Sequence, residues 1–168
     1  HSPAILFIDL DPGQAEFTIQ GCLSATKVTS PLMGPNFCHL DQAQVYCEYI
    51  GEVNVSNMPR SYEACLDRLL KHCEASEKLR RLPWLINTMG FTNGLGAKIM
   101  SKTLIKVRPT TVVELRSRFA KKNYKTDLRR HVQRLKSIDG VDCNILQYSA
   151  IPESLDAKDM RAKALWGL

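Results

Sequence analysis

The sequence lacks the features that define several large classes of protein. Its longest apolar run, residues 3–8, is too short to span a bilayer, and no basic leader precedes it. We therefore expect no membrane anchor. The six cysteines form no C-x-x-C pair, and neither Cys38–His39 nor His72–Cys73 has the paired spacing of a structural zinc site. We expect ordinary free thiols in a reducing compartment.

A phosphate-binding loop is also missing. No G-x-x-x-x-G-K-[ST] occurs among the 168 residues. The nearest string, residues 90–98, has the wrong spacing, and Ile99 follows it where a hydroxyl is needed for Mg²⁺. We interpret its glycines as a turn before a helix.

The charge of the chain is unevenly distributed. The net charge is +6, but residues 1–59 carry −5 and residues 60–168 carry +11. Residues 116–136 hold nine Lys or Arg side chains, among them Arg129, Arg130 and Arg134, against Asp127 alone. Such a basic segment attracts a polyanion such as RNA, although a solvated helix face has the same composition.

The length and composition indicate a single folded domain over residues 1–168. Hydrophobic residues make up 44% and charged residues 24%, which excludes a disordered tail or a fibrous repeat. The chain begins with His1 rather than Met, and an apolar strand pattern follows almost at once. We interpret it as a piece of a longer protein.

Strand patterns alternate with helical patterns along the chain. The expected strands are 4–8, 22–28, 45–50, 83–87, 110–115 and 143–148. The expected helices are 61–79, with Ser61 as its cap, 95–107, 126–136 and 156–168. This alternation predicts an α/β fold with a mostly parallel sheet flanked by helices, and 22–28 and 45–50 form a β-rich excursion from it.

Polar residues follow two of these strands. They are Asp9, Asp11 and Gln14 after the first strand, and Asn87, Thr88, Gly90 and Phe91 after the fourth. Ligands of α/β sheets collect beyond the carboxyl ends of the strands. A D-x-D pair there suits a Mg²⁺-linked nucleotide site, because carboxylates hold the metal and accept a proton from an attacking hydroxyl. Turns also favour Asp, so this pair alone leaves a purely structural role open.

Several strings taken together resemble the nucleolar polynucleotide 5′-hydroxyl kinases of pre-ribosomal RNA processing. These are P-loop RNA kinases related to the kinase of the mRNA cleavage and polyadenylation machinery. The strings are F-I-D-L-D-P-G-Q at 7–14, E-F-T at 16–18, S-P-L-M-G-P at 30–35, C-H-L at 38–40, Y-I-G at 49–51 and L-I-N-T-M-G at 85–90. The resemblance is densest over residues 4–115.

The resemblance implies a P-loop NTPase-like fold and transfer of the γ-phosphoryl group of ATP to an RNA 5′-hydroxyl, with Mg²⁺. It also implies a nuclear, nucleolar location and an endonuclease partner. Asp11 matches the family's catalytic carboxylate, which activates the hydroxyl and helps to hold Mg²⁺, directly or through water. Asp9 and Gln14 support it.

The same resemblance implies two groups of RNA and phosphate contacts. The N-T-M-G string matches the clasp that holds the RNA end, which assigns Asn87, Thr88 and Gly90 to RNA. Phe91 stands where the family usually has Trp; it keeps a face for stacking, but it also suits the core. Residues 156–168 resemble the lid helix, with Arg161 and Lys163 facing the transferred phosphoryl group, although an ordinary exposed arginine is equally compatible with so short a match.

In the family, the Walker A strand and loop come just before the position of residue 1. We therefore expect a partial P-loop kinase domain, incomplete at its N-terminus and inactive alone. A catalytically inactive RNA-binding scaffold of the same family is the rival hypothesis, favoured by Phe91. A metabolic P-loop enzyme shares the D-x-D strand end but explains neither the basic segment nor N-T-M-G.

Overall fold

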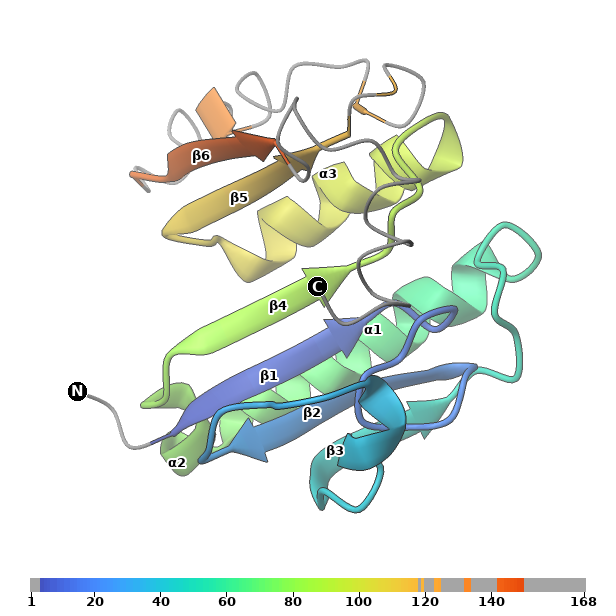
Figure 1. The fold of residues 1–168 in the computed structure, drawn as a ribbon. Coiled ribbons are helices and arrows are strands. Elements are labelled where there is room, and N and C mark those ends of the chain that lie inside the picture. Colours follow the sequence, from blue (N-terminus) through green and yellow to red (C-terminus); the bar gives the residue numbers. More distant parts are fainter. Residues whose placement is uncertain (1–3, 118, 120–122, 125–131, 134–141, 150–168) are drawn as a thin grey trace, which may run out of the picture. The chain divides into compact units, whose positions relative to one another are not determined.

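The computed structural model describes residues 4–117, 119, 123–124, 132–133 and 142–149. They belong to two compact units, residues 1–91 and 92–168, and each is described here by itself (Figure 1). The expected α/β class is confirmed, because helices and strands alternate in the described chain. The single domain over 1–168 stays a prediction.

The first unit contains a mixed four-stranded sheet in the order β3-β2-β1-β4. Its strands are β1 (Ile5–Leu10), β2 (Cys22–Val28), β3 (Gln44–Tyr49) and β4 (Trp84–Thr88). Only β1 and β4 pair in parallel, whereas β1–β2 and β2–β3 are antiparallel. The expected mostly parallel sheet is therefore wrong for this unit. Residues 11–21 contain no crossover helix, and the chain returns through them antiparallel to β1.

Helix α1 (Pro59–Ala75) covers one face of this sheet (Figure 1). Leu66, Leu69 and Cys73 of the helix are buried, as their helical spacing predicts. The buried Tyr62 hydroxyl donates to the Leu10 carbonyl at 2.9 Å, which fixes the helix to the end of β1. Burial of these side chains against the apolar face of β1 and β2 forms the core of the unit.

The opposite face lies under residues 11–21 and the short 3₁₀ helix η1 (Asn36–His39) (Figure 1). Strand alternation places Phe7 and Asp9 on this face together. The Phe7 ring packs edge-on against Phe17, with ring centroids 5.2 Å apart. The loop that follows β1 is therefore anchored over the strand it leaves.

The first helix differs from its predicted boundaries. It begins at Pro59, with Met58 rather than Ser61 as the N-cap, because proline has a fixed φ and lacks the N–H that a first turn leaves unpaired. Ser76 is extended and ends the helix before Leu79. The Ser76 hydroxyl accepts from the Leu79 N–H at 3.4 Å and so caps a separate short helix, α2 (Glu77–Arg80).

Strand β4 is the edge of its sheet rather than the buried strand that its apolar run predicts. Among the strands that the structure describes, it has one neighbour, β1. The Leu85 side chain is 53% exposed as a result. An apolar run in an edge strand looks the same in sequence as one in a central strand, so the sequence does not separate the two.

The second unit contains α3 (Leu95–Val107), β5 (Thr111–Arg116) and β6 (Asn144–Ser149). All three predicted elements are confirmed. Helix α3 ends at Arg108, which has a left-handed φ of 49° and is followed by Pro109. The two strands pair in parallel as a separate two-stranded sheet. The helices expected at 126–136 and 156–168 lie outside the described residues, except for the helical residues 132–133. Within the described chain, no helix is long and apolar enough to cross a membrane.

Candidate active site

The parallel pairing of β1 and β4 brings two predicted site segments to the same end of the first unit's sheet, beyond the carboxyl ends of these strands. The register sets Asp9 opposite Asn87 and Leu10 opposite Thr88. Because both strands run in the same direction, the residues that follow them leave the sheet at the same end, beyond the carboxyl ends of the strands. Asp11 follows β1, and Met89, Gly90 and Phe91 follow β4.

Asp9 is the buried member of the D-x-D pair. Its side chain is 1% exposed and lies within β1. One carboxylate oxygen, Oδ1, accepts from the Asn87 side-chain amide at 2.9 Å and from the Asp11 N–H at 3.2 Å. The other, Oδ2, accepts from the Glu16 N–H at 2.8 Å. Asp9 therefore supports the site by tying β1 to β4 and to the loop that carries Asp11.

Burial raises the pKa of the Asp9 carboxyl above its usual value. The hydrogen bonds from Glu16, Asn87 and Asp11 act in the opposite direction, because they stabilise the charged form. A carboxylate with both oxygens engaged in this way serves as an anchor for N–H groups.

Asp11 lies in a tight turn and is only half-buried. Its Oδ1 accepts from the Gly13 N–H at 3.0 Å and the Gln14 N–H at 3.3 Å. A Cβ at Gly13 would lie 3.3 Å from this Oδ1, so glycine leaves room for the turn. Within the described chain, Oδ2 accepts no hydrogen bond. This oxygen is available to a ligand.

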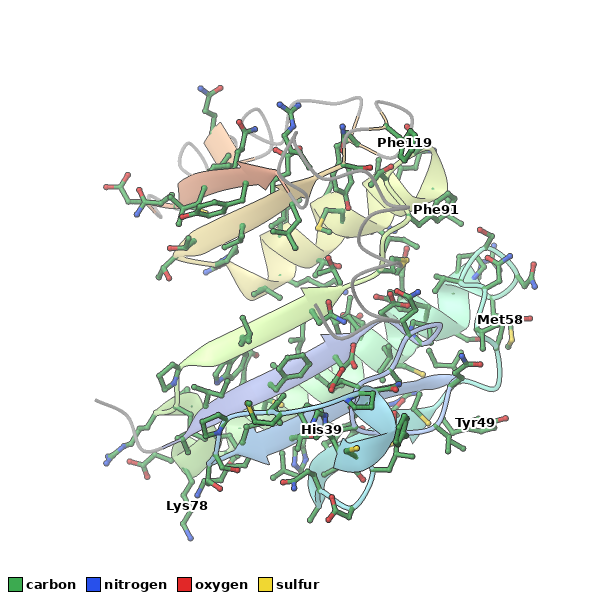
Figure 2. The ribbon with its side chains drawn as sticks, viewed as in Figure 1. His39, Tyr49, Met58, Lys78, Phe91 and Phe119 are labelled. Atoms are coloured by element: carbon green, nitrogen blue, oxygen red, sulfur yellow. The ribbon has the colours of Figure 1, made fainter. Side chains whose placement is uncertain are left out.

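Asp11 and the residues after β4 line the same pocket, of about 620 Å³. The lining residues are Asp11, Gln14, Val53, Asn54, Val55, Ser56, Met89, Gly90 and Phe91. The Phe91 side chain, labelled in Figure 2, is 39% exposed, which leaves part of its ring free to stack. The pocket therefore combines a carboxylate, two side-chain amides and an aromatic face.

Asn87 and Thr88 do not line this pocket. The Asn87 amide is engaged by Asp9, and Thr88 pairs with Leu10 as the last residue of β4. Contact of either residue with RNA stays a prediction.

Other predicted site residues lie outside the described residues. They are Arg129, Arg130, Arg134, Arg161 and Lys163.

Residues 53–56 form a wall of the pocket that the sequence did not indicate. Asn54 accepts from the Ser56 N–H at 3.0 Å, and Glu52 accepts from the Asn54 N–H at 2.9 Å. The hydrogen bonds from Asn54 and Asn57 lower the pKa of the Glu52 carboxyl. The available signal was a run of turn-forming residues, which identifies a loop but not the pocket it faces.

The donor set is compatible with Mg²⁺. Within the described residues, no three His, Cys, Asp or Glu side chains group as a metal cage. Mg²⁺ commonly keeps several waters and takes one or two carboxylates together with substrate phosphates. The half-exposed Asp11, with one engaged and one available oxygen, fits that mode of binding.

Comparisons with known proteins identify relatives of this chain. A curated fruit-fly protein, the Drosophila melanogaster polynucleotide 5′-hydroxyl-kinase NOL9, is 29% identical over 171 residues, which cover 99% of this chain and 17% of that protein. The Homo sapiens polynucleotide 5′-hydroxyl-kinase NOL9 is 33% identical over 126 residues, which cover 75% of this chain and 17% of that protein. The chain thus spans about a sixth of the length of these relatives.

A solved structure supports the fold. A chain of the wild-type Clp1p–Pcf11p complex matches 96% of this chain with a TM-score of 0.61 and 17% identity, over 40% of its own length. The family model described as "mRNA cleavage and polyadenylation factor CLP1 P-loop" matches residues 1–153. The predicted relationship to the P-loop RNA kinases is confirmed, and this chain belongs to the CLP1 P-loop family.

Proposed function

We propose that the protein containing this chain is an ATP-dependent polynucleotide 5′-hydroxyl kinase that acts on RNA. The observation that supports this most directly is the shared pocket of Asp11 and Phe91 at the ends of β1 and β4. A carboxylate beside an aromatic face suits a sugar hydroxyl and its neighbouring base. The kinase names of the curated relatives give independent support.

In this proposal Asp11 supplies the chemistry. Its available Oδ2 accepts the proton of the RNA 5′-hydroxyl as the 5′-oxygen attacks the γ-phosphorus, and ADP leaves. The hydrogen bonds of Gly13 and Gln14 to Oδ1 hold the carboxylate in one orientation. When bound, Mg²⁺ would supply positive charge near the phosphates, and Asp11 would hold it through a water, because its Oδ2 takes the proton of the hydroxyl.

In this proposal the segment after β4 binds the RNA end. Phe91 stacks on the terminal base, and Gly90, whose missing side chain leaves open space, lets the backbone approach the substrate. Asn87 and Thr88 set the position of this segment through β4. The smaller ring of Phe91 offers less stacking area than the Trp usual in the family.

Other parts of the proposal rest on residues outside the described ones. We assign Arg161, with Lys163 behind it, to the charge of the transferred phosphoryl group, and Arg129, Arg130 and Arg134 to RNA phosphates. The 168 residues contain no phosphate-binding loop motif, so we expect them to transfer no phosphate alone. A nucleolar role in pre-ribosomal RNA processing beside an endonuclease belongs to the same proposal.

A phosphate-transfer assay on the full-length protein tests the proposed function. Purified protein, γ-labelled ATP and Mg²⁺ are incubated with an oligoribonucleotide that ends in a 5′-hydroxyl. A matched oligonucleotide that already carries a 5′-phosphate is the control. Label on the first RNA alone supports the kinase. RNA binding without any transfer contradicts the kinase and favours the inactive RNA-binding scaffold.

A further inference from the structure

Three polar side chains hold the segment that follows the site turn. The Asn36 amide donates to the Ala15 carbonyl at 3.1 Å, and the Gln44 amide donates to the Phe17 carbonyl at 2.9 Å. Between them, His39 Nδ1 lies 2.6 Å from Glu16 Oε1. Residues 15–17, directly after Gln14, are thus fixed from three successive positions by the chain between 36 and 44.

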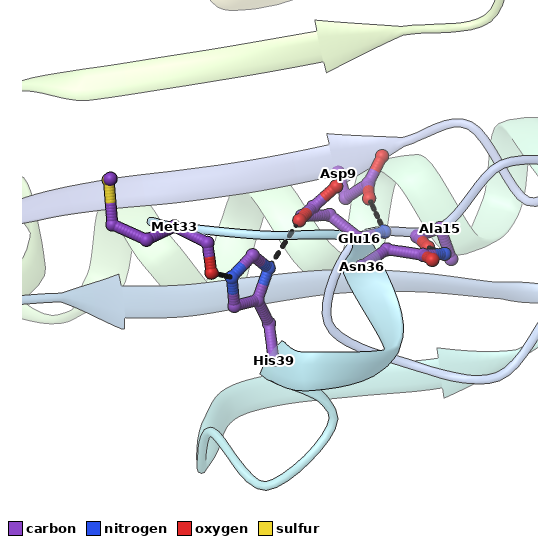
Figure 3. A network of polar contacts seen from close by, with 6 residues as sticks. All are labelled: Asp9, Ala15, Glu16, Met33, Asn36 and His39. Atoms are coloured by element: carbon purple, nitrogen blue, oxygen red, sulfur yellow. Dashed lines mark hydrogen bonds and ion pairs between the residues drawn. The ribbon is translucent and has the colours of Figure 1, made fainter. Parts of the chain in front are cut away.

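His39 is the most enclosed of these three groups. It is 6% exposed, and its ring lies 6.1 Å from the Phe17 ring, centroid to centroid. Figure 3 shows the ring between two acceptors, with Nδ1 toward Glu16 and Nε2 toward the Met33 carbonyl at 3.3 Å. A buried ring with a partner at each nitrogen has one orientation available.

Glu16 connects this ring to the site. Its side-chain carboxylate meets His39, while its backbone N–H donates to Asp9 Oδ2 at 2.8 Å. The other Asp9 oxygen accepts from the Asp11 N–H. The contacts therefore run without a break from His39 through Glu16 and Asp9 to the backbone of Asp11.

We propose that His39 is a positioning residue that acts through Glu16 and Asp9 to fix the Asp11 turn in its working geometry. The contact sequence fixes where the Asp11 carboxylate stands, and His39 touches no reacting atom. Loss of the His39–Glu16 contact leaves residues 15–17 without their central attachment, and the turn that precedes them gains freedom. This inference rests on the proposed function.

A comparable ion pair on the opposite face of the sheet provides the control. Arg68 of α1 donates to Glu48 of β3 through two nitrogens, at 2.7 and 2.6 Å. Neither residue lines the pocket. Substitution of Arg68 disturbs the unit by removing an ion pair, and it leaves the contacts of residues 11–17 in place.

The experiment compares four variants of the full-length protein. His39→Leu removes the contacts of the ring with Glu16 and with the Met33 carbonyl. Glu16→Ala removes the carboxylate that His39 contacts and keeps the buried ring. His39→Asn keeps an N–H donor close to the position of Nδ1 and is the rescue variant. Arg68→Leu is the control.

Two measurements are made on each variant, at a temperature where all are folded by circular dichroism. The first is amide hydrogen exchange of the peptide that spans residues 11–17, whose Gly13, Gln14 and Glu16 amides donate to Asp9 or Asp11. The second is phosphate transfer to a 5′-hydroxyl RNA, resolved into kcat and the KM for ATP.

We expect faster exchange in His39→Leu and Glu16→Ala, together with a loss of kcat of about 10- to 100-fold and a KM for ATP within about 2-fold of wild type. His39→Asn should recover most of both properties, and Arg68→Leu should change neither. Unchanged exchange in His39→Leu and Glu16→Ala overturns the proposal, as does faster exchange at an unchanged kcat.

The two proposals fail in different ways. If the wild-type protein transfers no phosphate, the proposed function fails, and the exchange measurement alone decides whether His39 fixes the turn. If Arg68→Leu loses as much kcat as His39→Leu, the effect is a general loss of stability, and the positioning role is overturned.

Discussion

Asn87 donates its side-chain amide to Asp9 across the parallel pair of β1 and β4, with 2.9 Å between Nδ2 and Oδ1. The Asp9 carboxylate is 1% exposed, so each donor that reaches it replaces a water that burial removed. This contact joins the strand that carries Asp11 to the strand that carries Phe91. It adds a side-chain link to the backbone pairing of the two strands that precede the pocket residues.

Loss of this donor should weaken the fold. Asn87→Ala leaves Asp9 with one fewer hydrogen bond in a buried position, and we expect the free energy of unfolding to fall by about 1–3 kcal/mol. Urea denaturation measures the change. Asn57→Ala removes an exposed amide that donates to Glu52 at 2.9 Å, and it should cost less than about 0.5 kcal/mol. Equal effects of the two substitutions would refute the role of Asn87.

The acid stability of the first unit should depend on Glu48. The two hydrogen bonds from Arg68 lower the pKa of the Glu48 carboxyl from 4.5 to about 2. A carboxyl with a lowered folded pKa stabilises the fold fully above its unfolded pKa and loses that contribution as the pH falls. The difference in unfolding free energy between wild type and Glu48→Gln should therefore shrink between pH 4.5 and pH 2. A difference that is constant over this range would contradict the assignment.

Phe91 should control affinity for RNA. Phe91→Ala removes a stacking face worth about 1–3 kcal/mol, which raises the KM for a 5′-hydroxyl RNA by about 5- to 150-fold and leaves the KM for ATP unchanged. Phe91→Trp should lower the KM for RNA. Phe37→Ala is the matched control, because Phe37 is 69% exposed on η1 and does not line the pocket. A Phe91→Ala protein that unfolds instead would assign the ring to packing.

The basic segment 116–136 should bind RNA through phosphates. Replacement of Arg129, Arg130 and Arg134 with Ala should flatten the slope of log affinity against log salt by about 2, since each phosphate contact to single-stranded RNA contributes about 0.7. The charge-matched control replaces the exposed Lys71, Lys78 and Arg80 of the first unit. Filter binding over a salt series gives both slopes. Equal slopes in the two triple variants would exclude these arginines from the RNA interface.

The sequence predicted the elements well and their assembly less well. Helix α3 and strand β2 have the predicted bounds, because the apolar spacing of each and the Pro109 stop are local signals. The antiparallel placement of β2 and the edge position of β4 depend on pairing between distant segments. A local pattern contains no information on such pairing.

In the candidate site, too, residues next to strand ends were predicted, whereas contacts between distant segments were not. Asp11 and Phe91 were predicted to share a site because both follow strands, and the parallel register of β1 and β4 accounts for it. The buried role of Asp9 and the contact of Glu16 with His39 were not predicted. Glu16 and His39 lie 23 positions apart, and only the folded loop brings them to 2.6 Å.

Substitution of Asp11 by Asn tests the central claim most directly. Asn keeps the shape of the turn but carries no negative charge and is a poor proton acceptor, so kcat for transfer to a 5′-hydroxyl RNA should fall by at least about 100-fold. RNA affinity should stay within about 2-fold of wild type. Asp41→Asn, which removes the same charge from an exposed position, should leave kcat unchanged. Turnover of Asp11→Asn within a few-fold of wild type would contradict the account.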